Sequence, residues 1–515
     1  MQAAFHHRLL FFSQPLNQPT KTSKLFFFST TTTPSCYRCI PSPSASSNIP
    51  IPSNLPDSSF SSSSSATAAA AITALEDYQR LFSSQPAESV DPLPLVATKG
   101  SLPADFPLGT YYLIGPGMIS DDHGSTVNPL DGHGYLRAFR FIGGGVVMYS
   151  ARYVETEAAK EEREAKTGEW RFRRSGIFSR LKSGWRAPSW TCIKNVANTT
   201  VLTWAGRLFC LWEGGYPYEL EPKSLATVGP ADFITAAEGR QRRGGGGGVL
   251  NLAAGITKLL IHGNQPTTPI YLLPRFSNNT ISRDWRIPIE APSQLWTCHV
   301  GNAYEEKDGN GKTKIKIQAS VCSYQWFNQK KLFGYDSQSS KLDPSFMNVE
   351  QQLLPHLVKI SIELDAEGSC LLCSIVDSST QWKNLVDFPV INPTNSGKAN
   401  RFMYASSTSG SREFLPHFPF DTVVKFDFSN GITKSWCTES RKFIGEPMFI
   451  SKNAKVCSFQ AEGKQYAVFK QKCYLVVLDA KRIGHDDAIE VKLEVPKHLT
   501  FPFGFHGFWN EKCEV

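Results

Sequence analysis

Short segments in which polar and apolar residues alternate, or in which a few apolar residues stand together, make up most of this chain. Alternation with a period of two is typical of a strand buried on one face, and a short apolar run is typical of a strand buried on both faces. Clear examples are residues 314–321, 358–364, 424–428, 466–469 and 474–478. Because helices do not alternate with these strands, the pattern predicts an all-β sandwich, barrel or propeller, and a propeller accommodates a chain of this length best.

Two segments carry a helical pattern instead. Residues 66–82 are rich in Ala and follow Ser65, which is a good N-cap. Residues 154–166 are rich in Ala, Glu and Lys, and Gly168 follows them as a helix-ending residue. We therefore expect one folded domain over residues 66–515 that begins with a helix and carries a second one near residue 160.

A low-complexity segment interrupts the strand pattern at 239–248, where five glycines follow an Arg-rich stretch. Such a run inside a folded chain indicates a flexible linker or an artificial junction. Residues 250–261 come next and carry apolar residues at helical spacing. This segment is predicted either as a core helix or as an amphipathic helix that lies on a membrane.

Length and composition set the outer limits. The chain has 515 residues, of which 41% are hydrophobic and 12% aromatic, so it can bury a substantial core. It has no run of eighteen apolar residues, so no membrane-spanning helix is expected. The net charge of +8 includes four basic residues near the N-terminus, and the remainder is too small to indicate nucleic-acid binding. The 12 cysteines follow no regular spacing, so we expect them to be reduced.

The first 60 residues differ in composition from the rest. Asp57 is the first acidic residue, Ser, Thr and Pro dominate, and residues 61–65 are all serine. An acid-poor, Ser-rich and weakly basic leader is typical of an organelle transit peptide. We expect a chloroplast transit peptide and disordered leader over 1–60; a mitochondrial address and a plain disordered tail are the alternatives.

Two histidines carry the most informative chemistry. His299 lies in Leu-Trp-Thr-Cys-His-Val-Gly, and His506 lies in Phe-Pro-Phe-Gly-Phe-His-Gly-Phe-Trp. The aromatic and small neighbours indicate rigid, partly buried surroundings, where a neutral imidazole is a good ligand for Zn, Cu, Fe or Ni. Taken alone, each histidine is more often a structural residue whose hydrogen bonds are satisfied.

A series of motifs gives these histidines a context. The segments are Gly-Thr-Tyr-Tyr-Leu-Ile-Gly-Pro-Gly at 109–117, Leu-Asp-Gly-His-Gly at 130–134, Asn-Val-Ala-Asn-Thr at 195–199, Leu-Trp-Glu-Gly-Gly-Tyr-Pro-Tyr at 211–218, Asp-Phe-Pro-Val-Ile-Asn at 387–392 and Gly-Glu-Pro-Met-Phe at 445–449. In this order, and with the two histidine motifs, the chain from about residue 92 to 509 resembles the carotenoid cleavage dioxygenases of plants. It is most similar to the type 7 branch of the strigolactone pathway, on the evidence of Asp-Asp-His-Gly-Ser-Thr at 121–126, Arg-Asp-Trp-Arg-Ile-Pro at 283–288 and Leu-Pro-His-Phe-Pro-Phe-Asp at 415–421.

The resemblance implies a seven-bladed β-propeller, capped by helical loops, that holds Fe(II) on its axis with four histidines. By this resemblance His299 is the third ligand and His506 the fourth. Three carboxylates that hydrogen-bond the outward nitrogens of the ligands correspond to Glu213, Asp387 and Glu446, and such partners fix the tautomer and raise ligand basicity. Asp387 stands where most of the family has Glu, so we expect either a bridging water or a slight turn of the ring.

The chain departs from the family between Glu213 and His299. The segments that carry the first two ligands have no counterpart there, and the one histidine of this span, His262, matches neither. The missing span corresponds to about two blades of ~40–45 residues each. We therefore expect a propeller that lacks about two blades, with unpaired edges and half of an iron site.

Three functions remain open from the sequence. The resemblance implies an O2-dependent enzyme that cleaves a carotenoid. The type 7 branch implies cleavage of the 9′,10′ bond of a 9-cis carotene to an apocarotenal and a ketone. This reaction would be an early step of strigolactone synthesis. Its partners would be the carotenoid, O2 and, peripherally, the plastid membrane, and its place the chloroplast stroma or membrane surface. A truncated, inactive carotenoid-binding remnant and a propeller that serves as an interaction module are the alternatives.

Overall fold

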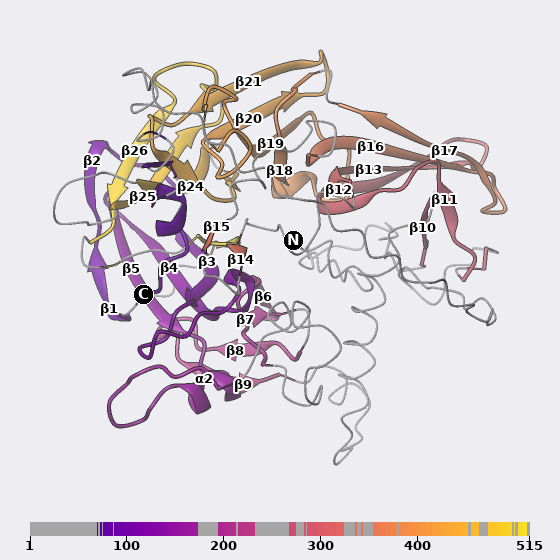
Figure 1. Ribbon diagram of the computed structural model, residues 1–515. Coiled ribbons are helices and arrows are strands. Elements are labelled where there is room, and N and C mark those ends of the chain that lie inside the picture. The colour runs from indigo at the N-terminus through magenta and orange to yellow at the C-terminus, as the bar shows by residue number, and fades with distance from the viewer. Residues whose placement is uncertain are drawn as a thin grey trace, which may run out of the picture.

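A computed structural model describes residues 70, 73–74, 76–85, 87–173, 194–212, 215–231, 267–273, 283–284, 286–323, 335–336, 341–342, 354–378, 381–413, 415–451, 455–462, 472–496, 499 and 503–511. Strands dominate these residues, and the sheets are arranged side by side around the molecule (Figure 1). The helical elements with defined bounds are α2 (Glu157–Glu162) and the 3₁₀ turns η2 (Pro129–Asp131) and η8 (Pro393–Asn395). The described part of the chain therefore has the all-β character that the sequence predicts.

Five sheets of four to six strands form the described propeller, and we number them as blades. Blade 1 has the order β1 (Ser89–Pro94), β5 (Val146–Tyr153), β4 (His133–Gly143), β3 (Gly109–Met118), β27 (His506–Asn510). Blade 2 consists of β6 (Thr200–Trp204), β7 (Arg207–Leu211), β8 (Tyr218–Leu220) and β9 (Thr227–Pro230). Blade 3 consists of β12 (Trp296–Lys307), β13 (Thr313–Cys322), β16 (His356–Leu364) and β17 (Cys370–Asp377).

Blade 4 consists of β18 (Val386–Val390), β19 (Phe402–Ser407), β20 (Thr422–Asp427) and β21 (Ile432–Cys437). Blade 5 has the order β2 (Val96–Gly100), β26 (Ile489–Glu494), β25 (Lys472–Asp479), β24 (Lys455–Glu462), β22 (Lys442–Ile444), and β23 (Met448–Ile450) also pairs with β24. Two hairpins lie outside the blades: β10 (Thr268–Ile270) with β11 (Ile289–Ala291), and β14 (Tyr335–Asp336) with β15 (Lys341–Leu342).

The strand predictions compare well with these bounds. The alternating segments 314–321, 358–364 and 424–428 lie in β13, β16 and β20, and 474–478 lies in β25. The segment 466–469 lies outside the described residues. Alternation succeeds because one face of each strand packs into a blade interface; β16, for example, alternates buried and half-buried positions over most of its length.

The two helix predictions have different outcomes. The described residues between 70 and 80 are helical, in agreement with the segment 66–82. The second helix is shorter than the predicted 154–166, because α2 begins only after its N-cap Thr156 and ends at Arg163. Arg163 has extended backbone and starts an isolated bridge to Trp170, so the chain turns there to return along the sheet.

Strands from the two ends of the chain share blades. The C-terminal strand β27 pairs with β3 in blade 1, and the N-terminal strand β2 pairs with β26 in blade 5. Each of these antiparallel pairs ties the beginning of the chain to its end, so blades 1 and 5 cannot separate without breaking a sheet. This double closure lies on the side of the molecule where the first and last colours of the chain meet in Figure 1.

The contacts between blades are uneven in the described residues. Strands β3 and β27 contact β6, strand β23 contacts β27, and strand β12 contacts β18. Blades 2 and 3 are separated in sequence by residues 231–295, of which 232–266, including the low-complexity segment 239–248, lie outside the described residues. The described residues form five blades, which confirms the predicted propeller; the predicted seven-bladed parent form and helical cap are not seen in them.

Membrane-spanning helices and disulfides are both absent from the described part of the chain. No helix there has the length and apolar character to cross a membrane. The described cysteines are free thiols, which agrees with the expected reduced state; they are Cys210, Cys298, Cys322, Cys370, Cys373, Cys437 and Cys473.

A buried charged cluster joins blade 1 to the segment that contains α2. His133 Nε2 lies 2.7 Å from Glu162 Oε2, and Lys194 Nζ donates to the same oxygen at 3.2 Å. The three side chains are fully buried, and Lys194 lies 4.5 Å from the centre of the Phe172 ring. Burial, together with the charge of Lys194, lowers the pKa of His133 from 6.5 to about 4. His133 is therefore neutral at pH 7 and serves the packing of this cluster.

Replacing His133 by glutamine should flatten the pH dependence of stability. Unfolded His133 binds its proton near pH 6.5 and the folded residue only near pH 4, so the unfolded state holds more protons in this window and stability falls as the pH falls. We expect the parent chain to lose about 3 kcal/mol more than His133→Gln between pH 7 and pH 4. Urea denaturation at a series of pH values measures this. The same change at the half-buried His356 is the control, and parallel pH curves for parent and His133→Gln would contradict the prediction.

Candidate metal centre

The two histidines that the sequence singles out come together in the structure. His299 lies in β12 of blade 3 and His506 opens β27 of blade 1. Their ring centres are 5.1 Å apart with an angle of 66° between the rings, and each residue is only 4% exposed. Two imidazoles from blades far apart in sequence thus share one buried site.

Asp387 holds the ring of His299. It lies in β18 of blade 4, and its Oδ1 is 2.7 Å from His299 Nδ1. The contact is direct, so the expected bridging water is not needed despite the shorter side chain. A register shift in β18 between Asp387 and Val390 and the left-handed backbone of Phe388 (φ 53°) accompany this approach. Bulges of this kind re-aim side chains next to functional sites.

Glu446 holds the ring of His506 in a similar way. Its Oε1 lies 3.1 Å from His506 Nδ1, and its Oε2 accepts a hydrogen bond of 2.8 Å from the backbone N–H of Gly507. A Cβ at residue 507 would lie 2.4 Å from the ring of Tyr111, so the position requires glycine. Both oxygens of the carboxylate are therefore used to fix the start of β27.

The electrostatics of the first pair favour a neutral imidazole beside an ionised carboxylate. Burial lowers the pKa of His299 to about 4, although Asp387 opposes this shift. The pKa of Asp387 falls to about 2 because the attraction and hydrogen bond of His299 outweigh the effect of burial. A neutral ring that donates its Nδ1–H to a carboxylate carries its lone pair on Nε2, which is the tautomer a metal ligand needs.

The site has the donor chemistry of a metal centre but only part of the donor number. His506 Nε2 is buried and has no hydrogen-bond partner, which is costly unless something else satisfies it. Among the residues that the structure describes, no group of three or more His, Cys, Asp or Glu is placed to hold a metal. The two imidazoles therefore supply two of the four ligands that the resemblance implies.

The remaining predicted site residue has a different outcome. Glu213 lies outside the described residues, as does His262, the one histidine between it and His299. Of the three predicted carboxylates, Asp387 and Glu446 are thus placed behind the histidines, and Glu213 stays a prediction.

An aromatic group that sequence reasoning missed lies against the histidines. The ring centre of Phe388 is 4.6 Å from His299 and 5.5 Å from His506. Phe420 meets Phe388 edge-on at 5.7 Å, and Phe418 meets Phe420 at 5.3 Å. Phe388 therefore lies against both imidazoles, and Phe420 and Phe418 extend this aromatic side of the site away from them. The density of phenylalanine in His-Phe-Pro-Phe-Asp at 417–421 was an available sequence signal for it.

Comparisons with known proteins agree with the geometry. The family model described as retinal pigment epithelial membrane protein matches residues 82–243 and 249–511. Carotenoid cleavage dioxygenase 7, chloroplastic, of Arabidopsis thaliana is 40% identical over 580 residues, covering 88% of this chain and 94% of the relative. The protein of the same name from Oryza sativa subsp. japonica is 41% identical over 559 residues, covering 85% and 92%.

Solved structures share the fold. A cobalt-substituted apocarotenoid oxygenase of Synechocystis matches with a TM-score of 0.62 at 22% identity, covering 85% of this chain and 99% of that chain. At this identity the likeness establishes the β-propeller architecture, and the family model and the two plant relatives establish descent. The chain therefore belongs to the retinal pigment epithelial membrane protein family, which is the family of the carotenoid oxygenases.

Proposed function

We propose that this chain has the function of a non-haem Fe(II)-dependent dioxygenase that cleaves a C=C bond of a carotenoid. The observation that carries the proposal is the pair of buried histidines, each held at Nδ1 by a carboxylate of another strand or loop. The plant relatives at 40% and 41% identity are named carotenoid cleavage dioxygenase 7, which supports a carotenoid as the substrate. The resemblance to the type 7 branch implies the 9′,10′ bond of a 9-cis carotene as the target. The products would be an apocarotenal and a ketone, early in strigolactone biosynthesis.

The residues present fit one side of an iron centre. His299 and His506 would hold Fe(II) through Nε2, with Asp387, Glu446 and Glu213 behind the ligands. When bound, the metal would supply the activation of O2 that the reaction needs. The chain's own contribution is the apolar side formed by Phe388, Phe418 and Phe420, which excludes water and gives a polyene a surface to lie against.

A shortened form of the enzyme is the second candidate. The alignment with the Arabidopsis relative spans 580 positions, whereas 88% of 515 residues is about 453, so about 127 positions have no residue from this chain. The family model also breaks between residues 243 and 249, at the glycine run. These findings support a missing span of about two blades or more at 239–248, and hence a carotenoid-binding remnant or an interaction module that lacks turnover. Sequencing the transcript across residues 239–249 tests whether this junction exists in the message.

The expected location follows from the same relatives. Both plant relatives are named chloroplastic, and the acid-poor leader over 1–60 supports a plastid address. We place the protein in the plastid stroma or at the membrane surface, where carotenoids are available. Import of a fusion between residues 1–60 and a fluorescent protein into isolated chloroplasts, compared with mitochondria, tests this address.

Asp387→Ala should weaken metal binding at His299 without unfolding the chain. Loss of the carboxylate frees the ring to rotate and lowers its basicity, and such partners are worth 10–100-fold in metal affinity. Titration with Co(II), followed by its visible absorption, measures the change without requiring turnover. Asp365→Ala, in the turn after β16, is the control. Equal Co(II) affinity in the parent and Asp387→Ala would show that His299 is not a ligand.

Three outcomes of one experiment separate the functions. Purified protein that contains iron and converts 9-cis carotene and O2 into apocarotenal supports the enzyme. Protein that binds carotene without iron or product supports the remnant, and folded protein that does none of these supports the interaction module. Iron content is measured by elemental analysis and products by mass spectrometry.

A further inference from the structure

We propose that the ion pair of Arg412 and Asp421 is a positioning clamp that fixes the loop 408–421, and with it the aromatic side of the metal centre. The loop joins β19 to β20 of blade 4 and carries Phe418 and Phe420. The purpose of that aromatic side, to hold a carotenoid, rests on the proposed function. The clamp itself rests on the contacts of the loop alone.

Asp421 connects the two ends of the loop 408–421. Its Oδ1 accepts hydrogen bonds from the backbone N–H of Ser409 at 2.7 Å and from the hydroxyl of Thr422 at 2.7 Å. Its Oδ2 accepts from the hydroxyl of Ser409 at 3.0 Å and lies 3.1 Å from Arg412 Nε. One carboxylate, only 7% exposed, thus joins the beginning of the loop to its end.

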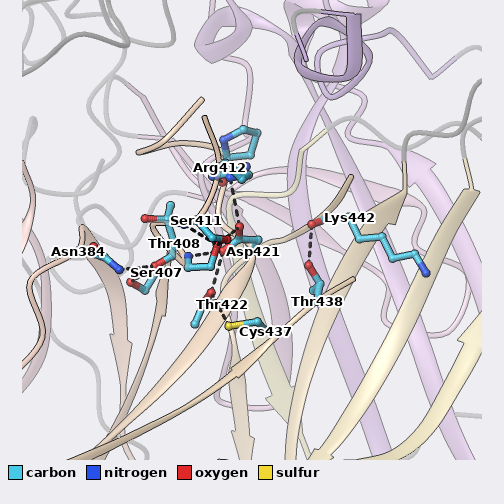
Figure 2. Close-up of polar contacts among 12 residues, drawn as sticks. Asn384, Ser407, Thr408, Ser411, Arg412, Asp421, Thr422, Cys437, Thr438 and Lys442 are labelled. Atoms are coloured by element: carbon cyan, nitrogen blue, oxygen red, sulfur yellow. Dashed lines mark hydrogen bonds and ion pairs between the residues drawn. The ribbon is translucent and has the colours of Figure 1, made fainter. Parts of the chain in front are cut away.

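Arg412 connects Asp421 to Pro419 within the loop and to Phe443 of blade 5. It donates from Nη2 to the backbone carbonyl of Pro419, and its guanidinium lies 5.4 Å from the ring centre of Phe443 in blade 5. Figure 2 shows Arg412 lying against Asp421, with Thr422 and Cys437 beyond the carboxylate. The cation therefore spans both ends of the loop and the interface between two blades.

The backbone beside the clamp places the aromatic residues. The N–H of Ile444 in β22 donates to the carbonyl of Phe420 at 2.8 Å, which holds this residue against blade 5. Phe420 reaches the histidines through Phe388, and Phe418 packs edge-on against Phe503 at 5.5 Å. A displacement of Pro419 or Asp421 would therefore move Phe418 and Phe420 relative to His299 and His506.

Packing and the clamp hold different parts of the loop. Leu415, Pro419 and Phe420 are buried, whereas residues 411 and 413 are exposed and 412 and 416–418 are half-buried. The buried carboxylate needs its cation, because removing one partner of a buried pair leaves an uncompensated charge. The ring positions of Phe418 and Phe420 therefore depend on core packing together with two charged side chains that do not touch the histidines.

Hydrogen exchange of the full chain tests the clamp directly. In Asp421→Asn we expect the amides of 408–421 to exchange at least 10-fold faster, while peptides from β13, β16 and β25 keep their rates. Arg412→Met should give the same local pattern, and Arg412→Lys, which keeps a cation, should restore part of the protection. Asp427→Asn breaks the ion pair with the exposed Arg401 on the same blade and is the matched control. Unchanged exchange in 408–421, or faster exchange throughout blade 4, would overturn the clamp.

Carotenoid binding separates the clamp from the proposed function. The absorption shift and induced circular dichroism of added β-carotene report binding without turnover. We expect Asp421→Asn to bind about 10-fold more weakly and with altered circular dichroism, and Asp427→Asn to bind like the parent. Parent protein that binds no carotenoid would contradict the proposed function, and hydrogen exchange alone would then decide for or against the clamp. Equal binding and equal circular dichroism in parent and Asp421→Asn would show that the loop does not position the ligand.

Discussion

Lys194→Met should destabilise the folded chain by about 3–5 kcal/mol. Lys194 is the cation that contacts the buried carboxylate of Glu162, at 3.2 Å. Among the contacts that remain without it are His133 and the backbone N–H of Arg173, which are neutral donors. An ionised carboxylate in such surroundings is costly because its solvation is not replaced. Equilibrium unfolding in urea, monitored by fluorescence, measures the loss.

A double variant distinguishes charge from packing in this cluster. Lys194→Met combined with Glu162→Gln also removes the charge of Glu162, so it should be more stable than Lys194→Met alone. Lys160→Met, at an exposed position of α2, is the control and should change stability by less than about 0.5 kcal/mol. A double variant as unstable as Lys194→Met alone would show that packing of the lysine stem against Phe172 accounts for the loss.

Much of the fold was accessible from the sequence because its elements follow local rules. Strand β16 buries one face over most of its length and so alternates, and strand β25 is buried on both faces and so is apolar. The resemblance brought His299 and His506 together, although they lie in blades 3 and 1. The pairing of β2 with β26 and of β27 with β3 joins strands from opposite ends of the chain. No local sequence pattern predicts such pairs.

Features that depend on long-range approach were missed. The direct contact between Asp387 and His299 depends on the bulge at Phe388, a positive-φ position that no glycine marks in the sequence. Glu162 is one of several acids in the predicted helix 154–166, and its burial arises from the return of the chain at Trp170. The clamp of Asp421 and Arg412 was hidden for the same reason, because polar residues in a loop are usually solvated.

If the chain is the proposed shortened form, replacing the glycine run by a longer segment should complete the metal site. We expect the chain, with residues 244–248 replaced by the corresponding segment of the Arabidopsis relative, to purify with about one iron per chain. The unaltered chain should lose iron during gel filtration, because its described residues offer two imidazoles, and even the loss of a ligand's carboxylate partner costs 10–100-fold in affinity. Elemental analysis of the purified proteins measures iron directly.

A control variant decides whether the restored iron sits at the proposed centre. His299→Ala in the extended chain should remove most of the iron and leave the fold intact, because the ring packs beside Phe388 and the pairing of β12 with β13 uses the backbone. Iron retained in that variant would place the metal elsewhere. If the unaltered chain retains one iron after treatment with a chelator, two further metal ligands already exist in this sequence. If iron binding requires both the added span and His299, the present chain supplies part of the metal centre. The positions of His299 and His506 are then already fixed by blades 3 and 1.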